Sequence, residues 1–331
     1  MIRGVLVTAG ERLGIDCEIP WVGELIQEAA DGGFLPDDPG TGTLRVRVER
    51  TRDPFETAGW EPLARGVLGG DRALVIRNLL STGFDLCADL RDETPLFRFR
   101  WRPARRDRAI ALALRSRFHL LARSALLRYP ALWWAGTRGR APLHASACTA
   151  GDGAVVLLAG PGGVGKSTLV SMEVAAGGQA ICDNVCVADG ASAWGVVEPL
   201  RVEGGPGRRM PHGRRETAMP GRVPMLAPDR VVVLRRGSGP TASVGPCDPE
   251  EASRSLITGT YMAQELRRYW AFASTLAAGT GIGPAHPPVA RVAAAFAERL
   301  PATRIILPSR PGPGLRELLA SVDQQEAGTW T

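Results

Sequence analysis

Residues 154 to 178 read AVVLLAGPGGVGKSTLVSMEVAAGG, and this stretch decides which fold we expect. Val155 to Ala159 is a short apolar run typical of a buried strand, and Thr168 to Ala176 is a helix candidate closed by two glycines. Between them, residues 160 to 167 match the pattern Gly, any four residues, Gly, Lys, Ser. A strand, a glycine-rich turn and a helix in this order predict an α/β fold with a phosphate-binding loop.

Each residue type in the loop suits contact with phosphate. Glycines let backbone N–H groups turn inward around phosphate oxygens, and the following helix directs its positive end toward them. We expect Lys166 to reach the β- and γ-phosphate oxygens and the Ser167 hydroxyl to bind Mg²⁺. The expected nucleotide-binding residues are Gly160, Pro161, Gly162, Gly163, Val164, Gly165, Lys166, Ser167 and Thr168.

The composition singles out the same lysine. Lysine and arginine together number 40, yet Lys166 is the one lysine in the 331 residues. Because arginine serves everywhere else, Lys166 should lie where a guanidinium is unsuitable. A compact, flexible ammonium that reaches a phosphate is such a case, since a planar guanidinium differs in shape and reach.

The remaining composition is that of a globular protein, with 44% hydrophobic and 22% charged residues. No stretch approaches the ~18 apolar residues of a membrane span, so we expect no stable membrane insertion. The first residues soon turn polar and acidic, which favours a cytoplasmic protein. The net charge of +6 is spread over arginines along the whole chain and does not indicate a nucleic-acid partner. The six cysteines lack paired metal spacing and are expected to be buried thiols.

Two other classes of nucleotide-binding protein fit the sequence less well. Gly160, Gly162 and Gly165 also satisfy the spacing of dinucleotide-binding enzymes, and Asp183 follows at a distance suited to a ribose-binding acid. That alternative leaves Lys166 and Ser167 unexplained. A transporter ATPase is disfavoured because no Leu-Ser-Gly-Gly-Gln-like segment and no apolar strand ending in Asp-Glu is found.

Acidic and basic side chains are expected on either side of the loop. Gln179 to Cys182 is predicted to be a second strand ending in Asp183 and Asn184. An acid there can hold Mg²⁺ or accept a proton from an attacking hydroxyl, although a plain turn is the structural alternative. Upstream, Leu143 to Cys148 is predicted to pair with the loop strand through the turn at residues 150 to 153, which places His144 near the sheet end.

Together these features resemble the HPr kinase/phosphorylase superfamily of bacterial serine kinases, over about fifty residues from His144 to Ala188. The resemblance implies ATP and Mg²⁺ as cofactors, His144 near the transferred phosphate, and Ser167 and Asp183 at the metal. The family's proton acceptor falls on Asn184, whose amide cannot accept a proton. Either Asp183 serves as the base, or Asn184 only orients metal or substrate, or the protein binds nucleotide without efficient transfer.

The resemblance extends weakly downstream. A further metal-binding Glu of the family would fall on Glu198, in Trp-Gly-Val-Val-Glu-Pro-Leu, and a surface Glu at the end of a strand is the structural alternative. The family's C-terminal signature for the carrier protein HPr is not evident, which argues against HPr as the substrate. The Gly/Pro/Arg-rich stretch from Gly204 to Arg222 is expected to be irregular, and it either holds phosphates or an acidic peptide or is a solvated loop. Its basic residues are Arg208, Arg209, Arg214 and Arg215 around His212.

The expected architecture is α/β, with a P-loop kinase core of HPr-kinase type and an N-terminal β-rich accessory domain. Residues 1–105 alternate in polarity between Gly/Pro/Asp clusters and form the accessory domain. Residues 106–140 are a connector helix, expected to pack on the kinase core rather than lie on a membrane. Residues 141–331 form the kinase domain, with further elements at Arg230 to Leu234, Pro249 to Ala278, Val289 to Leu300, Thr303 to Leu307 and Gly314 to Val322.

The expected activity is Mg²⁺-dependent transfer of the γ-phosphoryl group of ATP to a Ser or Thr hydroxyl. The expected acceptor is a peptide or small protein, with a ribosomally made precursor peptide as the first choice. The alternative is a catalytically weak nucleotide-binding switch or assembly protein. A homo-oligomer is compatible with the sequence, which does not separate ATP from GTP.

Overall fold

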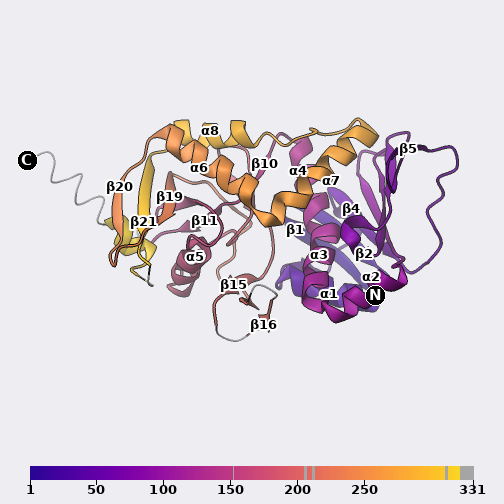
Figure 1. The fold of residues 1–331 in the computed structure, drawn as a ribbon, viewed down its shortest axis with the longest axis horizontal. Helices are drawn as coiled ribbons and strands as arrows, with labels where there is room; N and C mark the ends of the chain where they lie inside the picture. The colour runs from indigo at the N-terminus through magenta and orange to yellow at the C-terminus, as the bar shows by residue number, and fades with distance from the viewer. Residues whose placement is uncertain (152, 205–206, 211–212, 310–311, 321–331) are drawn as a thin grey trace, which may run out of the picture.

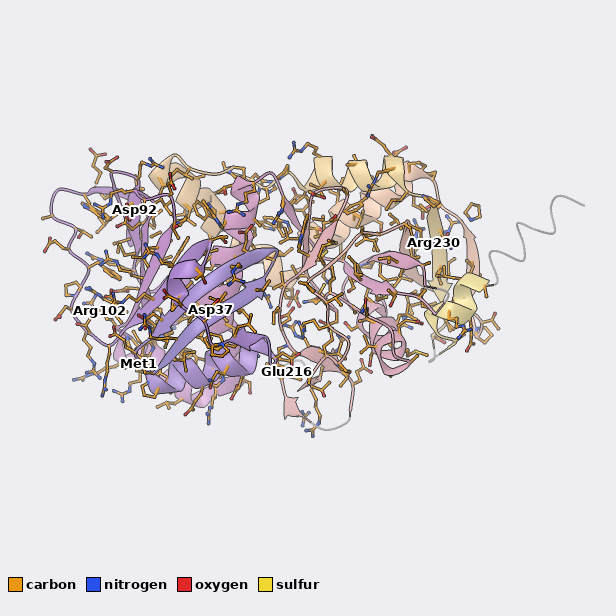
Figure 2. The ribbon with its side chains drawn as sticks, turned by 180° about the vertical axis from the view of Figure 1, so that it is seen from behind. Met1, Asp37, Asp92, Arg102, Glu216 and Arg230 are labelled. Carbon is orange, nitrogen blue, oxygen red and sulfur yellow. The ribbon has the colours of Figure 1, made fainter. Side chains whose placement is uncertain are left out.

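The computed structural model describes residues 1–151, 153–204, 207–210, 213–309 and 312–320. Figure 1 shows an elongated molecule with a large amino-terminal sheet at one end and a smaller sheet, flanked by α5, α6 and α8, at the other. Seen from behind, Arg102 and Arg230 mark these two ends, and Glu216 lies between them (Figure 2). Among the described residues, no helix combines the length and hydropathy needed to span a membrane.

The amino-terminal part is built on one nine-stranded mixed sheet with the order β3-β1-β2-β4-β9-β8-β7-β6-β5. Alternation decides its faces, as in the strand Leu-Arg-Val-Arg-Val-Glu, where the apolar side chains are buried and the arginines point outward. Helix α1 (Pro20–Ala30) lies against this sheet. The strands are β1 (Ile2–Thr8), β2 (Glu11–Cys17), β3 (Phe34–Leu35), β4 (Leu44–Glu49), β5 (Glu61–Ala64), β6 (Val67–Gly70), β7 (Ala73–Ile76), β8 (Phe84–Asp89) and β9 (Leu96–Trp101), with short 3-10 turns η1 (Pro39–Thr41) and η2 (Leu79–Ser81).

The connector is four segments instead of one helix. They are α2 (Arg105–Ala113), α3 (Arg115–Arg123), the π-helical η3 (Ser124–Arg128) and α4 (Tyr129–Thr137). The helix breaks at Leu114, whose φ of −117° and ψ of 48° are not helical. Helix α2 buries no residue, whereas Leu126, Leu132 and Trp133 enter the core of the amino-terminal sheet. The connector packs on both parts of the molecule, because α4 contacts β2 of the first sheet and also residues 141–143 and 264–280 of the expected kinase domain.

The second part contains the predicted loop strand in a five-stranded sheet of order β11-β12-β19-β21-β20. Its three central strands are parallel and its two edge strands antiparallel, so the protein is mixed α/β. The strands are β11 (Ser146–Thr149), β12 (Val155–Ala159), β19 (Arg230–Arg236), β20 (Ser243–Pro246) and β21 (Ala302–Leu307). The helices are α5 (Lys166–Ala175), α6 (Pro249–Met262), α7 (Gln264–Thr280) and α8 (Val289–Arg299), and residues 315–320 are also helical.

Two smaller sheets connect the parts of the molecule. One has the order β10-β13-β14-β18, with β10 (Ala141–Leu143), β13 (Cys186–Ala188), β14 (Ala193–Gly195) and β18 (Met225–Leu226). The other has the order β15-β17-β16, with β15 (Leu200–Val202), β16 (Arg208–Arg209) and β17 (Arg215–Thr217). Of the six cysteines five are buried and Cys247 is partly exposed, and all are free thiols.

Besides the connector, three predicted elements differ from the structure. The expected strand Leu143 to Cys148 divides into β10 and β11 in different sheets, so His144 lies at the junction, although β11 does pair antiparallel with β12. The expected strand Gln179 to Cys182 makes only isolated bridges at Ala180. The expected helix Pro249 to Ala278 breaks at Ala263 into α6 and α7. Asp152 of the predicted turn and residues 321–322 of the last predicted helix lie outside the described residues.

Candidate functional site

The glycine-rich turn joins β12 to α5, as the sequence predicts. Gly160, Gly163 and Gly165 have φ values of 147°, 77° and 126°, which side-chain-bearing residues rarely adopt. A Cβ atom at Gly160 would also lie 2.8 Å from the carbonyl oxygen of Leu234. The glycines are therefore required by the turn itself, and α5 begins directly behind it.

Lys166, the first residue of α5, is buried beneath this turn. Its Nζ donates hydrogen bonds to the carbonyl oxygens of Gly160 at 2.7 Å and Pro161 at 3.1 Å. Burial lowers the pKa of Lys166 to about 8, and the negative charges of Glu265 and Asp183 oppose that shift. The ammonium is therefore mostly protonated at neutral pH, and phosphate oxygens can replace the two carbonyl oxygens as its partners.

Asp183 lies beside the start of α5 and is fully buried. The Ser167 hydroxyl donates to the main-chain carbonyl of Asp183 at 3.3 Å, and carboxylate oxygen Oδ2 accepts from the backbone N–H of Arg201 at 3.2 Å. The other oxygen, Oδ1, is buried without a hydrogen-bond partner. Burial and the nearby Glu198 carboxylate raise the pKa of Asp183 to about 6. The unpartnered oxygen is available to a proton or a cation.

Glu198 is the second buried carboxylate of the site. Its Oε2 accepts from the guanidinium of Arg128, in η3, and from Nη2 of Arg201 at 2.8 Å. Burial alone would raise the pKa of Glu198, but these two guanidinium groups hold it below its ordinary value. Its other oxygen, Oε1, has no hydrogen-bond partner. Glu198 is therefore ionised and joined to the connector.

The oxygen atoms of this cluster fit a magnesium ion. Mg²⁺ in nucleotide sites is usually held by one or two carboxylates, with phosphate oxygens and water completing an octahedron. The Ser167 hydroxyl and the unpartnered carboxylate oxygens of Asp183 and Glu198 are ligands of this kind. Among the described residues, no three His, Cys, Asp or Glu side chains form a metal cluster of their own.

His144 and Asn184 lie next to each other beside the loop. The ring nitrogens of His144 lie 3.1 Å from the carbonyl oxygen of Gly259 and 3.0 Å from Oδ1 of Asn184. Burial and the Lys166 ammonium lower the pKa of His144 to about 4, so the ring is neutral at pH 7. A neutral imidazole carries one N–H, so only one of these two oxygens receives a hydrogen bond. His144 is thus a neutral polar group next to the loop.

Glu265, in the first turn of α7, is a site residue that the sequence did not reveal. Its Oε1 accepts from Nδ2 of Asn184 at 3.2 Å and from Nη1 of Arg201 at 3.1 Å. Although burial opposes it, the Arg201 charge helps to lower the pKa of Glu265 to about 2. Its side chain is 29% exposed, against 9% for Glu198. An acid early in a helix indicates only helix-dipole stabilisation, so no sequence signal marked it.

A cavity of about 550 Å³ opens beside the loop, within the size range of ligand sites. Gly163, Gly165, Ser167 and Thr168 line one side of it. Three guanidinium-bearing residues line it as well, namely Arg201, Arg214 and Arg236. The cavity therefore combines backbone from the loop with positive charge, which suits an anion with several oxygens.

Of the predicted loop residues, Gly163, Gly165, Ser167 and Thr168 line the cavity, whereas Gly160, Pro161, Gly162, Val164 and Lys166 do not. Val164 is buried in the core beneath the loop. In the arginine-rich stretch, Arg214 reaches the cavity, whereas Arg215 donates to the carbonyl of Gly207 at 2.7 Å and Arg209 is exposed. The side chain of Arg208 and the whole of His212 lie outside the described residues. The expected irregular stretch contains the short strands β16 and β17.

No protein-family model matches this sequence, and no curated protein matches it. A solved structure of the HPr(Ser) kinase/phosphatase from Coxiella burnetii is similar, with 13% sequence identity and a TM-score of 0.29. The similarity covers 57% of this chain and 93% of that chain.

Proposed function

We propose that this protein transfers the γ-phosphoryl group of ATP, in the presence of Mg²⁺, to a Ser or Thr hydroxyl of a peptide or small protein. The observation that carries the proposal is Lys166, the one lysine of the chain, held at 2.7 Å from a loop carbonyl with two buried carboxylates close by. Phosphoryl transfer relies on positioning and on positive charge around the phosphates, and this cluster supplies both.

We assign separate roles in phosphate binding, metal binding and hydrogen bonding to the residues of the site. The backbone of residues 160–165 and the start of α5 would surround the phosphates, with Lys166 donating to the β- and γ-oxygens. Ser167, Asp183 and Glu198 would hold Mg²⁺, which neutralises charge on the phosphate oxygens when bound. His144, being neutral, can donate or accept one hydrogen bond near the transferred group without adding charge.

Asp183 is the proposed proton acceptor. Its Oδ1 lacks a partner, and a carboxylate within hydrogen-bond reach can accept the proton of an attacking hydroxyl. Asn184 has no basic group, and its amide bridges His144 and Glu265, so its role here is to orient them. The site therefore keeps one acid, Asp183, although Asn184 stands where the HPr kinase family has its proton-accepting acid.

The proposed acceptor is a polypeptide, with a ribosomally made precursor peptide as the first choice. Guanidinium groups pair well with carboxylates and phosphates, and Arg214 and Arg236 line the cavity where such groups would approach. A nucleotide-controlled switch with weak catalysis is the second candidate. It is favoured by the ion pair between Glu198 and Arg128, because this pair links the site to the connector.

The first test is nucleotide binding by variants of Lys166. We expect Lys166→Ala and Lys166→Arg to weaken Mg-ATP binding by roughly 10- to 100-fold, because charge-assisted hydrogen bonds contribute about 1.5–3 kcal/mol. The arginine variant is the sharper control, since it keeps the charge and changes only its shape. Calorimetric titration measures the affinity, and circular dichroism confirms folding. Equal affinity in the wild type and both folded variants would contradict the proposal.

The second test is transfer. The protein is incubated with radiolabelled ATP and, separately, with a precursor peptide encoded beside its gene and a small-molecule extract. Label on the peptide, on Ser or Thr, is the expected result. Label confined to the small-molecule fraction would end the peptide hypothesis, and ATP binding without transfer to any hydroxyl would favour the switch.

A further inference from the structure

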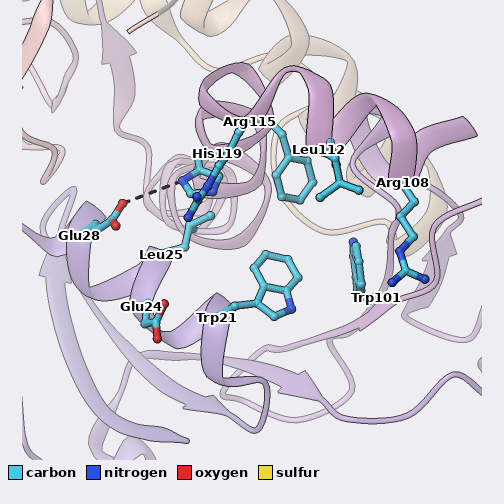
Figure 3. Close-up of a pocket in the computed structure, with 11 residues that line it drawn as sticks. Trp21, Glu24, Leu25, Glu28, Trp101, Arg108, Leu112, Arg115 and His119 are labelled. Atoms are coloured by element: carbon cyan, nitrogen blue, oxygen red, sulfur yellow. Dashed lines mark ion pairs between the residues drawn. The ribbon is translucent and has the colours of Figure 1, made fainter. Parts of the chain in front are cut away.

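A second cavity, of about 410 Å³, lies in the amino-terminal part among α1, the end of β9, α2 and α3 (Figure 3). Its apolar wall is aromatic. The indoles of Trp21 and Trp101 meet edge to face with ring centres 5.1 Å apart, and Phe118 lies 5.9 Å from Trp21. Figure 3 shows Leu112 of α2 above these rings. The cavity shares no lining residue with the one beside the phosphate loop.

No element in the described part of the chain buries helix α2, which forms one side of this cavity. In the helix, Ile110 and Leu112 are 43% and 77% exposed, and Leu114, just past its end, is 49% exposed. Short helices depend on packing of an apolar face for their stability, so exposed leucines beside an aromatic cavity indicate a surface that a partner covers.

Positive charge gathers on the α2 and α3 side of the cavity, where Arg108 and Arg115 line it. Residues 105, 106, 108, 115 and 117 are arginines, and no carboxylate of the described residues pairs with them. An adjoining hollow of about 220 Å³ shares Trp101 and Arg108 and adds Arg52 and Arg102. Arg102 pairs with Asp85 at 2.6 Å, whereas the described residues offer Arg108 and Arg115 no carboxylate partner. Charge complementarity at these two arginines calls for an anionic ligand.

The acidic residues on the α1 side of the cavity favour a peptide over a membrane as the ligand. Glu24 and Glu28 of α1 line the same cavity, and Glu28 already pairs with Arg123 at 3.2 Å and His119 at 3.9 Å. The flat surface of an anionic bilayer could not face the arginines without also facing these carboxylates, and it would not enter a concave site. A peptide can place one large side chain against the indoles and direct its acids to Arg108 and Arg115.

We propose that this cavity is a docking site for an acidic peptide segment that carries one large apolar side chain. The aromatic wall and Leu112 take the apolar side chain, and the guanidinium groups of α2 and α3 take the flanking carboxylates. The proposal goes beyond phosphoryl transfer, because docking here needs neither nucleotide nor the phosphate loop.

The test uses the full chain and a fluorescein-labelled peptide of about twelve residues, in which Glu residues flank a central Trp-Leu pair. Fluorescence anisotropy measures its binding. We expect the double variant Arg108→Ala/Arg115→Ala to bind about 5- to 10-fold more weakly, because each exposed ion pair contributes modestly. The matched control, Arg65→Ala/Arg77→Ala, removes the same charge from exposed positions that do not line the cavity.

Further variants separate the outcomes. Leu112→Ser changes an exposed side chain, so it should fold normally and still weaken binding several-fold. Lys166→Ala should bind the peptide like the wild type, whatever its effect on ATP. The proposal is overturned if the peptide with every Glu replaced by Lys binds as tightly, or if the double variant matches its control. It is also overturned if the protein sediments with phosphatidylserine vesicles and Leu112→Ser abolishes that sedimentation.

Discussion

At the scale of single residues, Asp183 and Asn184 are neighbours with different chemistry. Asp183 keeps a free carboxylate oxygen, whereas the Asn184 amide lies 3.0 Å from His144 and donates to Glu265. The sequence located both residues because they follow the loop helix closely. It did not show that Asn184 bridges to an acid 81 residues further along the chain.

Asp183→Asn should lower phosphoryl transfer by about 10²- to 10⁴-fold, the usual contribution of a positioned base, with ATP affinity changed by a small factor only. Without bound metal, burial and Glu198 raise the pKa of Asp183 to about 6, so the carboxylate is mostly protonated below that pH. Protons should therefore compete with Mg²⁺ for this carboxylate, and the Mg²⁺ concentration that gives half-maximal transfer should fall as the pH rises through about 6. A half-saturating Mg²⁺ concentration that stays constant from pH 5 to 8 would contradict this assignment.

The negative charge of Glu265 raises the pKa of Lys166, so removing this charge should lower that pKa. Its charge is the largest of the influences that keep the pKa of Lys166 from falling below about 8. In Glu265→Gln this pKa should fall, so Lys166 loses its proton at a lower pH. Affinity for Mg-ATP should then decline between pH 7 and 8.5 more steeply than in the wild type, as measured by calorimetry.

A matched control for Glu265 is available in α6. Glu250 also lies in the first turn of a helix, but it is exposed and pairs only with Arg254. Glu250→Gln should leave the pH dependence of ATP binding unchanged. If both variants behave alike, Glu265 does not act on Lys166.

At the scale of elements, the sequence pattern predicted the strands, turns and helices whose formation depends on residues close together in the chain. The apolar run predicts β12, the glycines predict the turn, and the residues up to the two closing glycines predict α5. All three elements are present in the structure. The break at Ala263 has no glycine or proline to announce it, and Ala263 is instead extended and buried in the first core. The kink at Leu114 and the division of residues 143–148 between two sheets also depend on tertiary contacts. The spacing of apolar residues along the chain does not predict such contacts.

Ion pairs join these elements across the molecule. Arg123 of α3 donates to both carboxylate oxygens of Glu216 in β17, at 3.0 and 2.8 Å, and to Glu28 of α1 at 3.2 Å. The Arg123 and Glu216 side chains are 10% and 7% exposed. This contact attaches the arginine-rich stretch to the amino-terminal part.

Arg123→Ala should destabilise the protein by about 3–5 kcal/mol, because it leaves the buried Glu216 carboxylate unpaired. Arg117→Ala, at an exposed position of the same helix, should change stability by less than about 0.5 kcal/mol. Urea unfolding followed by circular dichroism compares them. The double variant Arg123→Met/Glu216→Leu should recover much of the loss, and failure of the single variant to differ from Arg117→Ala would contradict the expectation.

At the scale of the whole molecule, one core crosses the boundary that the sequence suggested. Residues 141–331 were expected to form the kinase domain, yet α7 of that segment packs into the core of the amino-terminal sheet with Leu132 and Trp133 of α4. Helices α6 and α8 belong to the other core. The division into 1–105, 106–140 and 141–331 remains a proposal about chain organisation, and α7 is the element that tests it.

Residues 141–331 produced alone should not fold stably. Without the amino-terminal sheet, α7 would expose Leu266, Tyr269, Phe272 and Leu276, each at most 3% exposed in the full chain. Burying such a side chain contributes about 1.5–3 kcal/mol, so the fragment would lose roughly 6–12 kcal/mol. That is comparable with the whole stability of an ordinary domain, about 5–15 kcal/mol. Thermal unfolding should show no cooperative transition for the fragment, and co-expression with residues 1–140 should restore one. A fragment that unfolds cooperatively and binds Mg-ATP like the full chain would establish 141–331 as an independent domain.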